Sequence, residues 1–181
     1  MRDLSLARLE PLVATTPGVR PLPAAARWIL RGGSKVRLAA EGALKLAVPE
    51  VACRAAAEGE SAALWLGPDE WLLIAAERKT DETAAALRSA LGGLAHSLVE
   101  VSHRQVALEL SGPDATALLA SGCPLDLDAD AFPVGMCTRT LLGKAEIVLW
   151  RTGAEAFRLE VWRSFAPYVS AFLAEAARGL A

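Results

Sequence analysis

The sequence predicts an α+β fold of two related, ferredoxin-like halves, each a small antiparallel or mixed sheet with helices on one face. Two passages about 85 residues apart share one order of strand, tight turn, strand and amphipathic helix. Residues 98–127 join two alternating apolar runs by a polar break and continue into an Ala/Leu helix. Of the 181 residues, 53% are hydrophobic and 22% are charged, a composition that supports a packed interior.

The chain is expected to divide into three segments. Residues 1–24 contain four prolines and predict an extended Pro/Ala-rich arm outside the core. Residues 25–95 form the first α+β half and residues 96–181 the second, together one compact domain. The N-terminus has no long apolar stretch with a small-residue cleavage pattern, so no secretory signal is expected.

In the first half, Gly32, Gly33 and Ser34 separate two apolar runs, 28–30 and 36–38, and predict a hairpin. Residues 49–60 are Ala-rich, and their pattern leaves a short helix and a loop equally open. Strands are predicted at 63–66 and 71–75, followed by a helix at 81–91. Acidic residues in the first turn of this helix and two glycines after it suit its two ends.

In the second half, the Gly-Pro-Asp sequence at 112–114 starts a helix, and Gly122 and Pro124 end it. Residues 138–142, 146–150 and 157–162 predict a three-strand meander with a turn at 143–144. The last predicted helix covers 165–178, and its apolar side chains recur at helical spacing. They are Phe165, Val169, Phe172, Leu173 and Ala176.

Composition argues against several classes of function. The net charge of −2, with scattered basic residues, gives no electrostatic basis for binding nucleic acid. No run approaches about 18 apolar residues, so no membrane span is expected. Three cysteines without a C-x-x-C motif indicate reduced thiols and a cytoplasmic protein. Two histidines and three isolated cysteines do not form a zinc-site pattern, and no nucleotide-binding loop or G-x-S-x-G motif occurs.

Neighbouring Ser102 and His103 invite a catalytic interpretation. Adjacent residues on a strand point to opposite faces, so the favoured interpretation is a polar kink. His103 and Arg104 remain candidates for a surface contact. Glu109 and Glu160 alternate with apolar neighbours, and Arg158 and Arg163 flank the same strand. These charges indicate either a solvated cross-strand row or the rim of a protein interface.

Five tryptophans lie in or beside the predicted strands, at positions 28, 65, 71, 150 and 162. One interpretation is core packing. Trp65, Trp71 and Trp150 lie at turns or strand ends, however, and residues 148–150 are apolar on both faces, which requires a second covering layer. Because aromatic anchors are typical of interface centres, the alternative is that at least two tryptophans, from Trp65, Trp71, Trp150 and Trp162, contact a partner.

Three long phrases carry a family resemblance. LGPDEWLLIA at 66–75, EVSHRQVALELSGPDATALLASGCPLDL at 100–127 and TRTLLGKAEIVLWRTGAEAFRLEVWRSFAPYVSAFL at 138–173 resemble the gamma subunit of heterotetrameric sarcosine oxidase. More distantly, they are similar to the folate-binding part of the glycine cleavage T-protein. Here the sequence departs from the T-protein, with Glu100 in place of an aspartate and Ala145-Glu146 in place of an acidic pair. These departures argue against an independent folate activity.

The resemblance implies a non-catalytic structural subunit with a T-protein-like fold. Such enzymes oxidise sarcosine with oxygen to glycine, hydrogen peroxide and formaldehyde, or methylene-tetrahydrofolate when folate is present. FAD, FMN, NAD and folate belong to the alpha and beta subunits, zinc belongs to delta, and gamma packs on the folate-binding portion of alpha without a cofactor of its own. An obligate interface of this kind buries on the order of 2,000 Å² or more.

Two other hypotheses remain open from the sequence. The first is a stand-alone, T-protein-like folate or one-carbon protein, for which Glu100, Glu146 and Arg163 are the candidate folate residues. The second is an adaptor that keeps the ancestral fold and binds another partner. Fold alone does not separate these functions.

Overall fold

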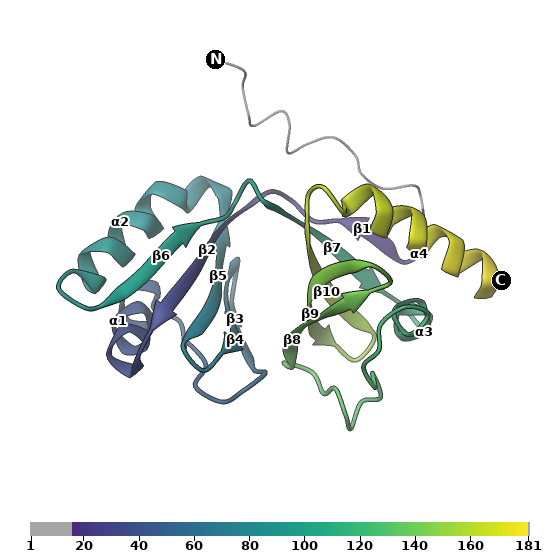
Figure 1. The fold of residues 1–181 in the computed structure, drawn as a ribbon, viewed down its shortest axis with the longest axis horizontal. Coiled ribbons are helices and arrows are strands. Elements are labelled where there is room, and N and C mark those ends of the chain that lie inside the picture. Colours follow the sequence, from purple (N-terminus) through teal and green to yellow (C-terminus); the bar gives the residue numbers. More distant parts are fainter. Residues whose placement is uncertain (1–15, 181) are drawn as a thin grey trace, which may run out of the picture. The chain divides into compact units, whose positions relative to one another are not determined.

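The computed structural model describes residues 16–180, which form two compact units (Figure 1). The N-terminal unit is made of residues 25–102. The C-terminal unit combines residues 16–24 with residues 103–180. Each unit is an antiparallel five-stranded sheet with two α-helices on one face, so the predicted α+β fold of two related halves is confirmed.

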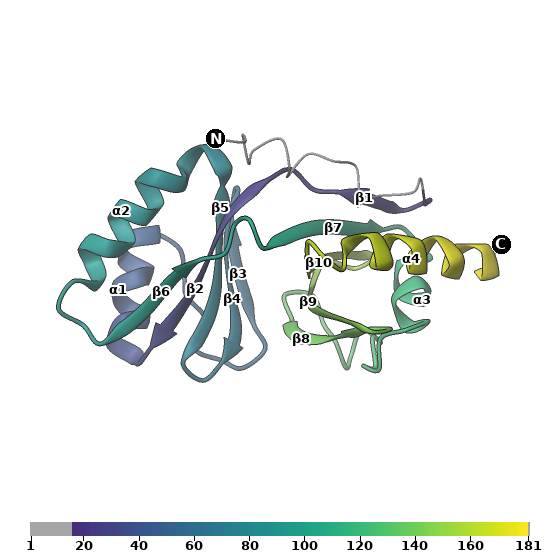
Figure 2. The same cartoon turned by 45° about the horizontal axis from the view of Figure 1, so that its top comes forward.

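The N-terminal unit has the strand order β3-β4-β5-β2-β6, and α1 and α2 cover one face of this sheet (Figure 2). Its core lies between the helices and the sheet and includes Trp28, Leu73 and Leu87. In chain order, its elements are β2 (Ala25–Gly32), α1 (Ser34–Leu44), β3 (Ala55–Glu58), β4 (Ser61–Gly67), β5 (Glu70–Ala76), the 3-10 turn η2 (Glu77–Lys79), α2 (Thr80–Leu91) and β6 (His96–Glu100).

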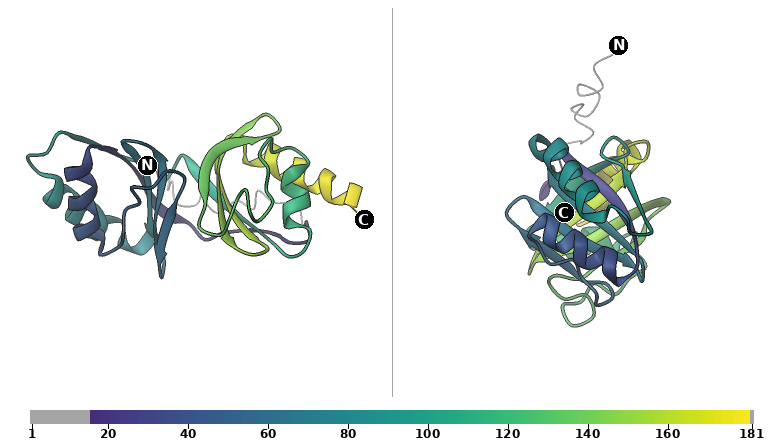
Figure 3. Two further views of the ribbon diagram at one scale, coloured as in Figure 1. Left: turned by 90° about the horizontal axis from the view of Figure 1, so that it is seen from below. Right: turned by 90° about the vertical axis from the view of Figure 1, so that its left-hand side faces the viewer.

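The C-terminal unit has the strand order β1-β7-β10-β9-β8, and α3 and α4 lie on one face of the sheet (Figure 3). Its core includes Leu149, Leu159 and Val169. In chain order, its elements are β1 (Val19–Pro21), β7 (Gln105–Ser111), α3 (Ala115–Ala120), β8 (Cys137–Leu142), β9 (Ala145–Gly153), β10 (Ala156–Trp162) and α4 (Ala166–Leu180).

The two sheets repeat one arrangement. A strand, a helix, a three-strand meander and a second helix follow one another from β2 to α2 and again from β7 to α4. The edge strand next to β2 is β6, which follows α2. The edge strand next to β7 is β1, which comes from the N-terminal end of the described chain. The order predicted from the two similar passages is therefore present in both units.

The hairpin predicted at Gly32-Gly33-Ser34 is wrong, because α1 begins at Ser34. The backbone N–H groups of Val36 and Arg37 donate to Gly33 O at 2.9 and 3.1 Å and start the helix. Val36 and Ala40, four residues apart, are its buried positions. A Gly-Gly pair suits a strand-to-helix turn as well as a hairpin, and the apolar spacing after it favours the helix.

Long-range strand pairing also changes the expected boundaries. Val19, placed in the arm, pairs with Leu110 of β7 and is 8% exposed, so residues 16–24 belong to the C-terminal unit. Residues 1–15 of the expected arm lie outside the described residues. β6 pairs with β2, which places residues 96–102 in the N-terminal unit. The stretch 49–60 contains the short strand β3.

Both sheets carry apolar side chains on both faces. In β5, Leu73 belongs to the core beneath α1 and α2, while its neighbours Leu72 and Ile74 point to the opposite face and are also buried. In β9, Leu149 faces α3 and α4, and Val148, on the other face, is 5% exposed. Among residues 16–180, the model contains no helix with the length and apolar character to cross a membrane.

Candidate functional site

Exposed aromatic and cationic side chains gather where β10 ends. Trp162 is the last residue of β10 and is 41% exposed, and Phe165, three residues later, is 42% exposed. The guanidinium carbon of Arg104 lies 5.0 Å from the centroid of the Trp162 ring. Arg163 N donates to Arg104 O at 2.8 Å and ties the two segments together. We call these four residues the Trp162 cluster.

The Trp162 cluster unites residues that the sequence suggested separately. Arg104 and Trp162 were expected at a partner surface, and Arg163 was a folate candidate. His103 is exposed and directly precedes Arg104. Phe165 was assigned to the inner face of the last helix, but it lies just before α4 and is exposed, because α4 begins at Ala166.

A row of charges crosses the face of the C-terminal sheet that is turned away from its helices. Arg20 on β1 pairs with Glu109 on β7 at 2.8 Å, and Arg158 lies opposite Glu109 in the register. Arg158 in turn forms an ion pair with Glu160 at 2.7 Å. Glu160 is only 1% exposed, so the row is solvated at Arg20 and buried at its other end. A buried carboxylate of this kind needs its cationic partner to offset the cost of desolvation.

The remaining tryptophans differ in exposure. Trp71 is 2% exposed, and its Nε1 donates to Pro49 O at 2.7 Å, which makes it a core residue of the N-terminal unit. Trp28 is equally buried. Trp65 and Trp150 are half-buried, and the buried Nε1 of Trp150 has no acceptor within residues 16–180. Of the four tryptophans that were candidate partner contacts, Trp65, Trp150 and Trp162 are therefore at least partly exposed, and Trp71 is buried.

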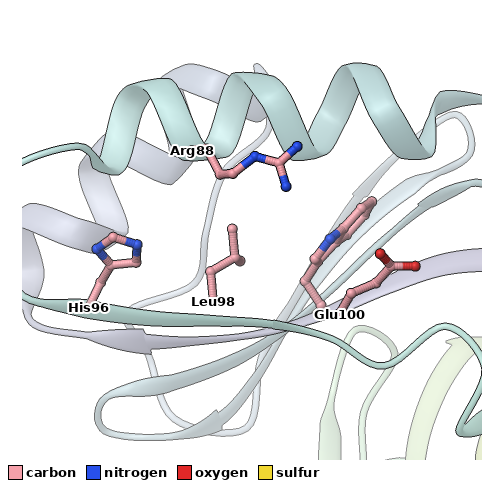
Figure 4. Close-up of a pocket in the computed structure, with 5 residues that line it drawn as sticks. Arg88, His96, Leu98 and Glu100 are labelled. Carbon is pink, nitrogen blue, oxygen red and sulfur yellow. The ribbon is translucent and has the colours of Figure 1, made fainter.

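A groove of about 390 Å³ lies between α2 and β6 in the N-terminal unit (Figure 4). Its lining residues are Trp28, Arg88, His96, Leu98 and Glu100. Glu100 is anchored at one end, because Ser102 Oγ donates to its Oε1 at 2.9 Å and accepts from Arg27 N at 2.9 Å. The ring Nδ1 of His96 lies 2.8 Å from Leu94 O, an arrangement that leaves Nε2 available.

The three folate candidates belong to two different units. Glu100 lines the groove of the N-terminal unit, whereas Glu146 and Arg163 belong to the C-terminal unit. Ile147 of β9 pairs with Val161 of β10, so Glu146 lies beside the end of β10, where the Trp162 cluster begins. No hydrogen bond or ion pair among the described residues joins any two of them. Arg88 and His96, the other polar residues of the groove, were missed. The alternation of His96, Leu98 and Glu100 was the signal that places these three side chains on one face.

The described part of the chain shows no cluster of three or more His, Cys, Asp or Glu side chains that could hold a metal ion. The three cysteines are free thiols in the structure; Cys123 and Cys137 are buried and Cys53 is half-buried. Among the described residues, the Trp162 cluster and the groove beside β6 are the two surfaces that bring together residues singled out from the sequence.

Comparisons with known proteins give one family. The model of the sarcosine oxidase gamma subunit family matches residues 34–179. The sarcosine oxidase subunit gamma of Arthrobacter sp is 41% identical over 144 residues, 80% of this chain and 66% of that protein. The same subunit of Corynebacterium sp. (strain P-1) is 40% identical over 116 residues, 64% of this chain and 56% of that protein. The matches thus span less than two thirds of both relatives.

The comparison with solved structures agrees with this family. A chain of the heterotetrameric sarcosine oxidase from Corynebacterium sp. U-96, in complex with pyrrole 2-carboxylate, superposes with a TM-score of 0.83 at 30% identity, over 97% of this chain and 92% of that one. Aminomethyltransferase T of the glycine cleavage system from Bartonella henselae has a TM-score of 0.64 at 16% identity, over 90% of this chain and 46% of that one. This second likeness concerns the fold alone.

Proposed function

This chain belongs to the sarcosine oxidase gamma subunit family, and from this premise we propose that it is a structural, non-catalytic gamma subunit of a flavin-dependent heterotetrameric sarcosine oxidase. The assembled enzyme would convert sarcosine, oxygen and water to glycine, hydrogen peroxide and formaldehyde, or methylene-tetrahydrofolate when folate is present. The observation that carries the proposal is the superposition of 97% of this chain on one chain of such a heterotetramer.

In this proposal, the alpha subunit is the main partner, through its folate-binding portion, and beta and delta complete the assembly. The Trp162 cluster supports a protein contact, because Trp162 and Phe165 expose aromatic surface beside the cation Arg104. Aromatic and arginine side chains are enriched at the centres of interfaces, where desolvation makes each contact count most. The half-buried Trp65 and Trp150 add further aromatic surface.

We assign the cofactors to the other subunits: FAD, FMN, NAD and tetrahydrofolate to alpha and beta, and zinc to delta. These groups would supply the redox and one-carbon chemistry in a cytoplasmic enzyme. The role left for this chain is to stabilise the folded alpha subunit by covering apolar surface. The family match over residues 34–179 supports this division of labour over a folate site within this chain.

The test is reconstitution from the cognate subunits. We expect this chain, co-expressed with alpha, beta and delta, to elute with them in one complex on size exclusion. Omission of this chain should lower the yield of soluble alpha or the thermal stability of the assembly. A stable monomer that never co-purifies with alpha would contradict the proposal.

The alternative of a stand-alone folate protein has its own test. The purified chain is titrated with tetrahydrofolate while the fluorescence of its five tryptophans is followed. We expect no saturable change. Saturable quenching at micromolar folate by the isolated chain would support the alternative, and Glu100→Gln, Glu146→Gln and Arg163→Met would then locate the site.

A further inference from the structure

The strand β6 lies at the edge of the N-terminal sheet and pairs only with β2 among the described strands. Its five residues include no proline or lysine, and its register with β2 has no bulge. Proline, lysine and bulges are common features that protect an edge strand from pairing with another chain, and β6 lacks all three. The equivalent edge strand of the C-terminal unit, β1, has only three residues and ends in Pro21. Thus β6 is longer and less protected than β1, and β3 and β8 form the other edges of the two sheets.

The register shows which backbone groups of β6 are open. Val101 N donates to Arg27 O at 2.8 Å, so the backbone groups of Val101 point toward β2. In an antiparallel pair this direction alternates along the strand, so Ser97 and Val99 also point toward β2. The N–H and C=O groups of His96, Leu98 and Glu100 therefore point away from β2, toward the open edge.

The same three residues place their side chains in the groove. His96, Leu98 and Glu100 lie directly opposite Gly32, Leu30 and Trp28 of β2, and Leu98 packs against the core beneath α1 and α2. Figure 4 shows these three side chains along β6, with the Arg88 side chain running beneath α2 on the side away from His96. A strand added to β6 would therefore have every second side chain in contact with this groove.

The charges in the groove are available to a ligand. Several arginines of the described chain pair with a carboxylate, as in Arg31 with Asp69 at 3.0 Å and Arg37 with Glu41 at 3.1 Å. Arg88 forms no ion pair within residues 16–180, although Glu100 lines the same groove. The carboxylate of Glu100 is held by the buried Ser102 and not by a cation. The groove thus presents the cation Arg88, the imidazole of His96 and one fixed carboxylate around the apolar Leu98 and Trp28.

We propose that β6 and the groove beside α2 bind an extended segment of a partner subunit, which adds a strand to the N-terminal sheet. The segment would carry an acidic side chain toward Arg88 and His96 and a basic one toward Glu100, on one face and two or four residues apart. Backbone hydrogen bonds give affinity in this mode of recognition, and the groove gives specificity. The inference rests on the proposed function, because it requires that the chain assembles with other subunits.

Hydrogen exchange in the assembled complex tests the backbone part of this proposal. In the free chain, the amides of Ser97 and Val99 should be protected by β2, and those of Leu98 and Glu100 should exchange fast. Assembly with the cognate subunits should slow exchange at Leu98 and Glu100 at least about tenfold, because both amides gain an acceptor. If the chain assembles but these two amides exchange as in the free chain, the inference is wrong. If the chain does not assemble, the proposed function fails.

Substitutions test the groove and the edge separately. Glu100→Lys and Arg88→Glu should each weaken assembly about tenfold or more, because each reverses a charge that faces the segment. Glu82→Lys makes the same charge change as Glu100→Lys, but on the exposed first turn of α2, and should leave assembly unchanged. Leu98→Pro removes an amide that points to the open edge, so it should block strand addition while the free chain stays folded. Equal effects of Glu100→Lys and Glu82→Lys would overturn the specificity argument.

Two further outcomes would give the groove another occupant. Protection of Leu98 and Glu100 that rises with the concentration of the free chain would indicate pairing with a second copy. Protection on addition of glycine or sarcosine alone would indicate a small zwitterion held between Arg88 and Glu100. Each result would overturn the proposal of a partner segment.

Discussion

The guanidinium of Arg104 lies over the indole of Trp162, with 5.0 Å between its carbon and the ring centroid, and both side chains are exposed. Such a pair stabilises the free chain by only about 0.5–1 kcal/mol at an exposed site. An aromatic side chain buried at the centre of an interface can contribute about 2 kcal/mol or more. Trp162→Ala should therefore lower the affinity for the alpha subunit far more than it lowers the stability of the free chain.

Binding measured by titration calorimetry and unfolding measured in urea separate these two quantities. Phe165→Ala should act in the same direction, because Phe165 is similarly exposed and lies in the same cluster. Val134→Ala, at an exposed apolar residue outside the cluster, serves as the control. Equal affinities for wild type and Trp162→Ala would remove the cluster from the interface.

Trp71 should behave in the opposite way. It is 2% exposed and its Nε1 donates to Pro49 O at 2.7 Å. We expect Trp71→Ala to lower the free energy of unfolding by about 3–5 kcal/mol through loss of packing. Trp71→Phe keeps much of the packing but leaves Pro49 O without its donor, at a cost of about 1–3 kcal/mol. Urea unfolding checks both values, and a Trp71→Phe variant as stable as wild type would contradict this account.

Arg151 holds a long connection through its guanidinium. It is 6% exposed, and it donates to four carbonyl oxygens and stacks on Phe157, with its carbon 5.1 Å from the ring centroid. The four acceptors are Leu127 O at 3.2 Å, Phe132 O at 3.0 Å, Gly153 O at 3.3 Å and Ala154 O at 2.6 Å. Two of them belong to the segment between α3 and β8.

Arg151→Lys should destabilise the C-terminal unit, although it keeps the charge. An ammonium group is a compact donor and cannot reproduce the planar fork of the guanidinium, so some of the buried carbonyls lose their partner. The expected loss is about 1–3 kcal/mol in the free energy of unfolding. Lys144→Arg, at an exposed turn, is the matched control and should change stability little. Faster hydrogen exchange confined to residues 125–136 would locate the effect.

The pair of Glu60 and Arg78 predicts a small dependence of stability on pH. The hydrogen bond from Arg78 holds the pKa of Glu60 below its usual value of 4.5. A carboxylate with a lowered folded-state pKa stabilises the fold above its unfolded pKa, and this contribution disappears as the pH falls through the folded-state pKa. Both side chains are exposed, so salt should screen the effect.

Glu60→Gln should remove this dependence. Urea unfolding at low salt should show wild type slightly more stable than the variant near pH 7, with the difference lost at acidic pH. Glu58→Gln, at the exposed end of β3 two residues earlier, is the control. A difference that persists below the folded-state pKa would mean that Glu60 acts through packing and not through its charge.

Local patterns predicted α2, α4 and the three-strand meander closely. The helix expected at 81–91 is α2 (Thr80–Leu91), and the one expected at 165–178 is α4 (Ala166–Leu180), because both have strong helical periodicity. The helix α1 was missed, because its Gly-Gly entry matches a hairpin turn equally well. Glu160 was expected on an outward strand face, in a solvated row or at an interface rim, but it is 1% exposed, since alternation along a strand gives its face and not what covers that face.

The candidate sites were predicted only in part. Trp162, Arg104 and Glu100 were identified from sequence, because exposed strand ends and isolated charges are visible there. Their neighbours Arg88 and Phe165 were not identified. Arg88 lies near β6 only because α2 packs on the sheet, and Phe165 is exposed because α4 begins one residue later. Trp71 was one of four candidate partner contacts because of its position beside a turn, and core packing was the other interpretation; its indole is buried and donates to Pro49 O.

The sequence by itself determined the α+β class, the repeat of two halves and the family, because these depend on periodicity and on long ordered phrases. Only the tertiary structure decided which strands stand beside β2 and β7, since β6 and β1 join them across long sequence separations. That pairing sets which backbone groups remain open and which side chains share a groove. Hydrogen bonding between distant segments leaves little local signal, so the open edge of β6 could be recognised only after the chain was folded.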